Sequence, residues 1–283
     1  AEMPRGGLED RLRFLKRPGG KIRIAAESKS NQAVKILAAV LVGITVFAFA
    51  TFDYKEIDFL QAIADTLRNI RTVFLQPELS RDTITGVLYQ LAVTFCLGAL
   101  STLFGAVLAF FASLLCAKNL ANPVVANIVK SFVALVRAVP TVLWVLIFAV
   151  SAGLGSVAAV VGLTFHSFAY LTKVYAEAIE EINPGTIEAL KASGAGFWQI
   201  VFQAVVPSSI SYLVAWTFMR FEINFTNAVA MGAAAGAGGI GYNLYMAGSF
   251  YFDLHEMGIL TYVVVIAVVI LEAVSTKIKA SVK

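Results

Sequence analysis

Residues 183–207, NPGTIEALKASGAGFWQIVFQAVVP, form a polar, glycine-containing segment between two long apolar runs. Asn183 can cap a helix whose first residue is Pro184, because a proline at that position has no N–H left without a partner. Gly194 and Gly196 are expected to end this helix, since glycine readily adopts the backbone conformation of a helix stop. The segment therefore predicts a short, rigid helix outside the membrane, between two spans.

The composition around this segment is that of an integral membrane protein. Of the 283 residues, 59% are hydrophobic and 14% are charged, whereas soluble domains carry roughly 25% charged residues. A helix that crosses a bilayer needs about 20 apolar residues, so the chain is predicted to be all-α with about six transmembrane helices. The net charge of +4 comes largely from the N-terminal segment. Because no basic surface with interleaved aromatic residues accompanies it, nucleic acid is not an expected partner.

The apolar runs predict the order of segments along the chain. Basic residues dominate positions 1–32, which are expected to form a cytoplasmic tail. Residues 33–52 are expected to form the first transmembrane helix. Residues 53–82 are expected to form an extracytoplasmic loop, with an amphipathic helix that lies on the membrane surface or packs on the bundle. The core, residues 83–279, should contain five further spans, at residues 83–117, 122–152, 156–175, 200–221 and 257–274. An even number of crossings places both termini in the cytoplasm.

Three parts of the core depart from a simple apolar helix. The run 122–152 begins with an amphipathic half, in which Lys130 and Arg137 share a face. Pro207 should kink the fifth span, because it has no N–H to donate within the helix. Residues 231–246 are rich in glycine and alanine, with few large side chains, and should therefore be covered by protein rather than by lipid.

Part of the segment 183–207 forms a motif that consists of Glu188, Ala189, Leu190, Gly194 and Pro207. This spacing resembles the EAA loop of ABC importer permeases, the cytoplasmic element that docks into a groove on the ATPase. Leu190 stands in place of the second alanine. Upstream the resemblance includes Arg137-Ala-Val-Pro140, and downstream Arg220-Phe-Glu222-x-Asn224 and the stretch MGAAAGAGGIG at 231–241. Among these permeases, the downstream motifs are most similar to the phosphonate, phosphite and phosphate importer group.

The resemblance implies a type I ABC importer permease core with a coupling loop at residues 183–199. It implies a homodimer of this chain in the bacterial plasma (inner) membrane, assembled with two ATPase subunits and an extracytoplasmic substrate-binding protein. The subunits would translocate a phosphorus oxyanion by alternating access. ATP and Mg would be bound by the ATPase subunits, because this chain has no G-x-x-x-x-G-K-[ST] sequence. No cofactor and no enzymatic activity are expected of this chain itself.

Two other functions are compatible with parts of the sequence. Permeases of amino-acid or quaternary-amine importers share the coupling loop and the glycine stretch. A membrane-embedded enzyme or scaffold is an alternative of another class, although the sequence shows no catalytic constellation that would support an enzyme. His255-Glu256 lacks the second histidine of a zinc hydrolase helix, and no metal site is expected.

Charged and polar residues within the spans are candidates for the translocation pathway. An ionised side chain at the centre of a membrane helix costs on the order of 3 kcal/mol, so such residues usually face water, a partner or a substrate. The candidates are Arg137, Arg220, Glu222 and Asn224. The last three are placed near the outer end of the fifth span, where a structural ion pair or snorkelling is an equally plausible role. His166 is expected to be a hydrogen-bonded packing residue rather than a proton relay.

The sequence Gly236-Ala-Gly238-Gly239-Ile-Gly241 matches the G-x-G-x-x-G pattern of dinucleotide sites. That reading is rejected, because the pattern neither follows a predicted strand nor lies in a βαβ unit. Two compatible roles remain: close helix packing through small residues, together with Gly232, or a lining of the pathway by backbone.

Overall fold

The computed structural model describes residues 14–16, 22–24, 29–52 and 57–282. Apart from a hairpin of two three-residue strands, β1 (Phe14–Lys16) and β2 (Ile22–Ile24), the described elements are helical. The chain divides into two compact units, residues 1–63 and 64–283. Most of the expected tail at residues 1–32 lies outside the described residues.

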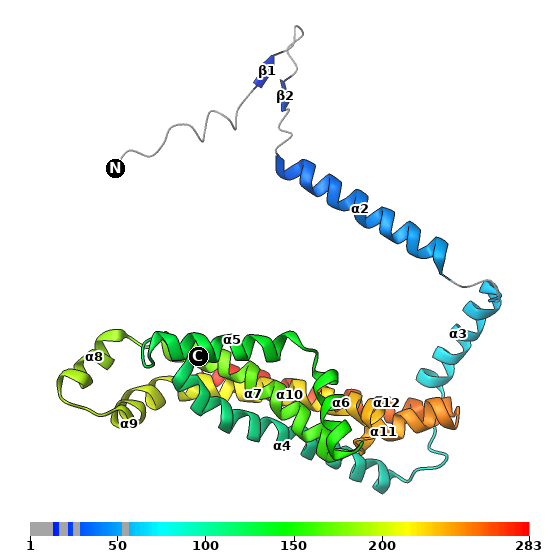
Figure 1. The fold of residues 1–283 in the computed structure, drawn as a ribbon. Helices are drawn as coiled ribbons and strands as arrows, with labels where there is room; N and C mark the ends of the chain where they lie inside the picture. Colours follow the sequence, from blue (N-terminus) through cyan, green and yellow to red (C-terminus); the bar gives the residue numbers. More distant parts are fainter. Residues whose placement is uncertain (1–13, 17–21, 25–28, 53–56, 283) are drawn as a thin grey trace. The chain divides into compact units, whose positions relative to one another are not determined.

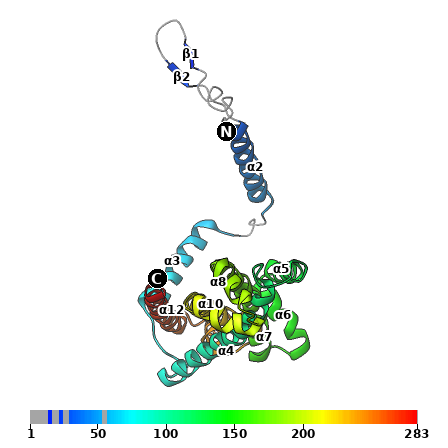
Figure 2. The same ribbon diagram turned by 90° about the vertical axis from the view of Figure 1, so that its left-hand side faces the viewer.

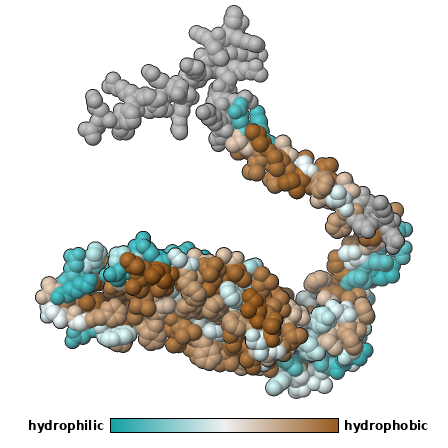
Figure 3. Space-filling view, viewed as in Figure 1, coloured by the Kyte–Doolittle hydropathy of each residue, from teal (hydrophilic) through white to brown (hydrophobic). Residues whose placement is uncertain are grey.

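In the first unit, α2 (Lys29–Thr51) is the first expected span. Its apolar stretch, Asn31–Thr51, has 21 residues and is long enough to cross a bilayer. All its residues from 31 onward are exposed, and Figure 3 shows apolar side chains along most of this helix. α3 (Phe59–Leu75) follows as the predicted amphipathic helix. The C-terminal end of α3 packs on the bundle, since the Tyr262 hydroxyl donates to the Phe74 carbonyl at 2.6 Å.

The second unit is a helical bundle (Figures 1 and 2). Its helices follow one another as α4 (Ile84–Cys116), α5 (Pro123–Ala138), α6 (Thr141–Ala152), α7 (Ser156–Glu180), α8 (Pro184–Ala192), α9 (Phe197–Ile200), η1 (Val201–Val205), α10 (Val206–Ala235), α11 (Gly239–Tyr245), η2 (Met246–Phe250) and α12 (Leu254–Val282). α4, α7 and α10 pack against one another at the centre. α5 and α6 lie against α7, α11 packs on α4 and α10, and α12 packs on α10 and α11.

Glycines let the central helices approach closely. A Cβ atom on Gly98 of α4 would lie 3.0 Å from the backbone nitrogen of Phe225 in α10. A Cβ atom on Gly105 would lie 2.7 Å from the Cβ of Ser167 in α7. Both distances are shorter than ordinary van der Waals contacts, so any larger residue would push α4 away from its neighbours.

Among the described residues, five helices are long and apolar enough to cross a membrane, or six if the bent pair α5–α6 counts as one span. This agrees with the prediction of about six transmembrane helices. The run 122–152, which was expected as an amphipathic half leading into the third span, is divided in the structure, because α5 and α6 meet at a bend of 90°. The cause is local: Pro140 disfavours a helical conformation at the preceding residue, and Val139 is extended.

The expected end of the fifth span at residue 221 is also wrong. The helical run continues from Phe197 to Ala235, over 39 residues. Alanine is the strongest helix former, so the small residues beyond 227 extend α10 until Gly236, with φ +60°, ends it. The kink expected at Pro207 is not among the bends of more than 40°, and the helical run passes through this residue, which follows the π-helical η1 at the second position of α10. The expected spans at 156–175 and 257–274 are longer than predicted, as α7 and α12 show.

Candidate functional site

The segment 183–207 folds into a capped helix as predicted. The Asn183 Oδ1 accepts a hydrogen bond from the Gly185 N–H at 2.9 Å, with Pro184 at the first helical position. The helix ends at Gly194, which has φ +83°, and the Ala195 N–H returns to the Leu190 carbonyl at 3.0 Å. Because few residues other than glycine adopt this conformation, Gly194 fixes the chain reversal between α8 and α9.

The helix α8 has one buried face and one free face. Ile187 is 2% exposed and packs with Ile179, Ile182 and Val201 at the end of the bundle, and Leu190 packs beside them. Leu190 therefore has a packing role on the inner face. Glu188, Ala189 and Lys191 are exposed. In Figure 1, α8 and α9 project from one end of the bundle, which leaves this free face open to a partner.

Arg220 is buried at the centre of the bundle rather than near the outer end of the fifth span. It is 3% exposed and lies 23 residues after the start and 15 before the end of the run Phe197–Ala235. Its Nε donates to the Ser167 Oγ at 2.9 Å, and its Nη2 lies 2.8 Å from the His166 Nδ1. Since an arginine only donates, the His166 Nδ1 must accept, and its proton sits on Nε2. His166 is thus hydrogen-bonded, as predicted.

Asn224, one helical turn after Arg220, completes a polar network between three helices. Its Nδ2 donates to the Ser167 Oγ and to the Thr102 Oγ1, both at 2.8 Å. The Ser167 hydroxyl in turn donates to the Leu163 carbonyl at 2.6 Å. α4, α7 and α10 are therefore joined through side chains that are buried and, apart from Arg220, uncharged. The sequence indicated Arg220 and Asn224 but not Ser167 or Thr102, because single hydroxyl residues are common in apolar helices.

Glu222 does not belong to this network. It is half-buried, and among the described residues its carboxylate forms no ion pair with Arg220 or with another cation. The structural ion pair that the sequence left open is therefore not formed. Arg137 is exposed on α5, with its guanidinium 6.0 Å from the centre of the Tyr170 ring. The Arg220 guanidinium lies 5.2 Å from the same ring. Tyr170, which the sequence did not single out, thus lies beside both arginines.

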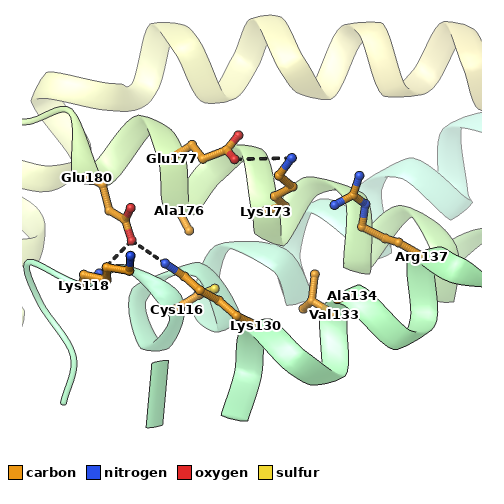
Figure 4. Close-up of a pocket in the computed structure, with 10 residues that line it drawn as sticks. All are labelled: Cys116, Lys118, Lys130, Val133, Ala134, Arg137, Lys173, Ala176, Glu177 and Glu180. Carbon is orange, nitrogen blue, oxygen red and sulfur yellow. Dashed lines mark hydrogen bonds and ion pairs between the residues drawn. The ribbon is translucent and has the colours of Figure 1, made fainter. Parts of the chain in front are cut away.

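A basic pocket opens where α5 and α7 meet the end of α4 (Figure 4). It has a volume of about 360 Å³. Its charged lining residues are Lys118, Lys130, Arg137, Lys173, Glu177 and Glu180. Lys130 pairs with Glu180 at 2.8 Å, and Lys173 pairs with Glu177 at 3.4 Å. Since Glu180 precedes Asn183 by three residues, the pocket lies at the end of the bundle that carries α8.

The glycine stretch turns the chain back onto α10. A Cβ atom on Gly232 would lie 2.6 Å from the backbone nitrogen of Tyr242, and one on Gly241 would overlap the Val229 carbonyl. Gly239 donates its N–H to Gln90 of α4 at 3.1 Å. Gly236 and Gly238 have positive φ and open space around them. They therefore allow the chain to turn between α10 and α11 and are not needed for close contact between these helices. This geometry is that of close packing between backbones. In a separate respect, the described residues contain no group of His, Cys, Asp and Glu that could hold a metal ion.

A second polar cluster joins residues 76–83 to the start of α12, at the opposite end of α4 from the pocket. The Glu256 carboxylate, which is buried, accepts a hydrogen bond from the Asp82 N–H at 2.7 Å. The Ser80 hydroxyl donates to Asp253, and the Glu256 N–H donates to the other oxygen of that carboxylate at 3.1 Å. The contacts between these two parts of the chain gave no recognisable signal in the sequence, because the partners are more than 170 positions apart.

Comparison with known proteins places this arrangement in a family. The family described as binding-protein-dependent transport system inner membrane component matches residues 105–279. The phosphate-import permease protein PhnE of Mycolicibacterium smegmatis is 32% identical over 213 residues, which are 74% of this chain and 39% of PhnE. The chain thus matches well under half the length of that relative. The phosphite transport system permease protein PtxC of Stutzerimonas stutzeri is 31% identical over 196 residues, 69% of this chain and 69% of PtxC.

A solved structure shows the same fold. The inward-facing MetNI methionine ABC transporter aligns with a TM-score of 0.64 and 24% identity, over 72% of this chain and 100% of the transporter chain. The matched family region contains α7, α8, α10 and the C-terminal end of α4. The chain belongs to the family of binding-protein-dependent transport system inner membrane components.

Proposed function

We propose that this chain is the permease subunit of an ABC importer, with α8 as the helix that couples it to a separate ATPase. The observation that carries the proposal is the free face of α8. A short helix with a fixed cap, a glycine stop and a buried Ile187 projects from the bundle and presents Glu188 and Ala189 outward. Such a rigid projection can transmit movement of an ATPase to α7, which precedes it in the chain, and through α9 and η1 to α10.

The assembly that goes with this role contains a second copy of the chain, two ATPase subunits and an extracytoplasmic substrate-binding protein. ATP and Mg would bind to the ATPase subunits alone. The complex would lie in the bacterial plasma membrane, with both termini of this chain in the cytoplasm. The apolar surface of the bundle supports a membrane location, since exposed apolar side chains cover much of the face seen in Figure 3.

For the substrate we propose phosphonate or a related phosphorus oxyanion, phosphite or phosphate. The names of PhnE and PtxC support this class. The chemistry of Arg220 supports it as well, because a buried guanidinium carries a fixed fork of donors that matches such oxygens. Arg220 would act as a transient station, moderated by Asn224, with which it shares the Ser167 hydroxyl. Its burial means that α7 and α10 must move apart before substrate reaches it.

Uptake by the complete transporter tests this proposal. The permease, its ATPase and its binding protein are reconstituted in liposomes, and uptake of phosphonate, phosphite, phosphate and methionine is compared. We expect ATP-dependent uptake of at least one phosphorus oxyanion and none of methionine. In Arg220→Lys and Arg220→Gln, uptake should fall while assembly and basal ATP hydrolysis persist. Transport of methionine alone would overturn the substrate assignment, and normal uptake by Arg220→Gln would remove Arg220 from the pathway.

A further inference from the structure

The basic pocket has the size of a site for a small ligand. Its volume of about 360 Å³ falls within the range of about 300–1,000 Å³ found for small-molecule sites. Three separate helices form it: α4 through its C-terminal end, α5 through Lys130 and Arg137, and α7 through Lys173, Glu177 and Glu180. A ligand held there would therefore contact α7, the helix that precedes α8 in the chain.

The charges in this pocket favour an anion. Four cations face two carboxylates, and each carboxylate already has a lysine partner, at 2.8 Å for Lys130 and at 3.4 Å for Lys173. Within the described part of the chain, no carboxylate lies at ion-pair distance from Arg137. Figure 4 shows its guanidinium directed across the pocket toward the Lys173 side chain. A guanidinium fork and an ammonium group thus converge on one space.

We infer that this pocket binds an oxyanion of the phosphate type, held between Arg137 and Lys173. The oxyanion is either the free substrate or the phosphate of an anionic lipid head group. The ligand must compete with Glu177 for Lys173, so binding is reversible, as a site that releases its ligand requires. For the free substrate, the pocket is the last station before the cytoplasm. That role rests on the proposed function, whereas the binding of an anion does not. The Tyr170 ring lies near the guanidinium of Arg137 and near that of the central Arg220.

Binding of radiolabelled inorganic phosphate to the full chain, assembled with its ATPase in a maltoside detergent free of phospholipid, tests the site. Arg137→Gln and Lys173→Gln should each weaken binding about tenfold, the loss expected for one charge-assisted contact. Glu177→Gln should tighten binding, because it removes a competing carboxylate from Lys173. A purely structural pocket would not respond with opposite signs. Arg71→Gln, which changes an exposed arginine on α3, serves as the matched control.

The outcomes separate the site from the proposed function. If Arg137→Gln binds phosphate as the Arg71→Gln control does, the proposal that the pocket binds an oxyanion is wrong. This holds even if the reconstituted complex still imports a phosphorus oxyanion. If the pocket variants lose binding but the complex imports no phosphorus oxyanion, the site stands and the proposed function fails.

The source of the oxyanion follows from a second measurement. Phosphatidylglycerol added to the detergent complex should displace phosphate if a lipid head group is the natural occupant, and uptake should then be unchanged in Arg137→Gln. If the free substrate is the occupant, phosphatidylglycerol should not compete, and uptake should fall in Arg137→Gln as binding does. If neither phosphatidylglycerol nor a transported oxyanion displaces the bound phosphate, the inference is overturned.

Discussion

At the scale of single residues, Arg220 shows how a cation can be buried without a carboxylate partner. Its direct hydrogen-bond partners, Ser167 and His166, are uncharged, and Ser167 is shared with Asn224. Burying a charge in this way is tolerable only when its donors are paired, because an unpaired buried charge is much more costly. The Ser167 hydroxyl, which accepts two hydrogen bonds and donates a third, is therefore the central atom of the network.

Removal of that hydroxyl should destabilise the permease. In Ser167→Ala, the Arg220 Nε and the Asn224 Nδ2 both lose an acceptor, at about 1–3 kcal/mol for each group left unsatisfied. Thermal unfolding in detergent measures the loss. Thr164→Val on the same helix is the matched control, since the Thr164 hydroxyl is buried without a hydrogen-bond partner and its removal should be neutral or stabilising. Equal losses in the two variants would contradict this account of the network.

Asp253 makes the polar cluster at the start of α12 sensitive to acid. The hydrogen bond from the Ser80 hydroxyl, followed by that from the Glu256 N–H, lowers the pKa of the Asp253 carboxyl. Because its folded pKa is lower than the unfolded value of about 3.9, its contribution to stability is present above about pH 4 and is lost as the pH falls through the folded pKa. Thermal unfolding from pH 7 to pH 3 should show a drop that is smaller in Asp253→Asn. The same dependence of thermal stability on pH in both proteins would contradict this role of Asp253.

Some functional residues could be predicted from the sequence because their chemistry is unusual in an apolar span, whereas others have a role only through contacts between helices. Arg220 and Asn224 are conspicuous because charge and amide groups are costly in an apolar span. Ser167 and Tyr170 are not, since their roles arise only when α7 meets α10. The position of Arg220 within its span was predicted incorrectly, because the helix was expected to end at residue 221 and continues to Ala235.

At the scale of elements, the segment 183–207 could be predicted in detail because its signals are local. The cap at Asn183, the proline after it and the stop at Gly194 each act within four residues. The bend between α5 and α6 has an equally local cause in Pro140, but the angle of 90° depends on how α6 packs against α7. The length of α10 could not be read from hydropathy, because its last residues are small and Gly232 among them packs against α11.

The stop at Gly194 offers a test of α8 as the coupling helix. At φ +83°, a β-branched residue is strained by about 1–2 kcal/mol, whereas asparagine tolerates this conformation. Gly194→Val should therefore disturb the turn into α9 and weaken association with the ATPase, while Gly194→Asn should retain it. Co-purification of the ATPase with each variant gives the measurement. Space around the position is open within this chain, so a steric clash inside the bundle does not confound the result.

Unchanged ATPase association in both variants would count against α8 as the docking element. Loss of ATPase association in both variants, with the spans still inserted, would indicate that the ATPase contacts residue 194 itself. Asparagine preserves the turn but adds a side chain at that position.

At the scale of the whole molecule, the order of spans predicts which loops face which side of the membrane. Glu78 lies exposed in the loop before α4, and Lys191 lies exposed on α8. Three crossings separate them, namely α4, the bent pair α5–α6 and α7, so the two residues should face opposite sides. In intact cells, a cysteine at Glu78→Cys should react with an impermeant thiol reagent, and one at Lys191→Cys should not. The unaltered chain is the control, because its own Cys96 lies within α4 and its Cys116 is buried. The reverse pattern would invert the topology.

The network around Arg220 also has a consequence for the order of synthesis. Its partner Ser167 precedes it by 53 residues, and Thr102, which joins through Asn224, lies 122 residues before that asparagine. At roughly 5–20 residues per second, α7 is made about 3–10 s before Arg220 emerges. The hydroxyl and imidazole groups that receive the guanidinium are thus synthesised before it. A rearranged gene in which α10 was translated before α4 and α7 would expose the same arginine to lipid without a partner, although the finished protein would contain identical contacts.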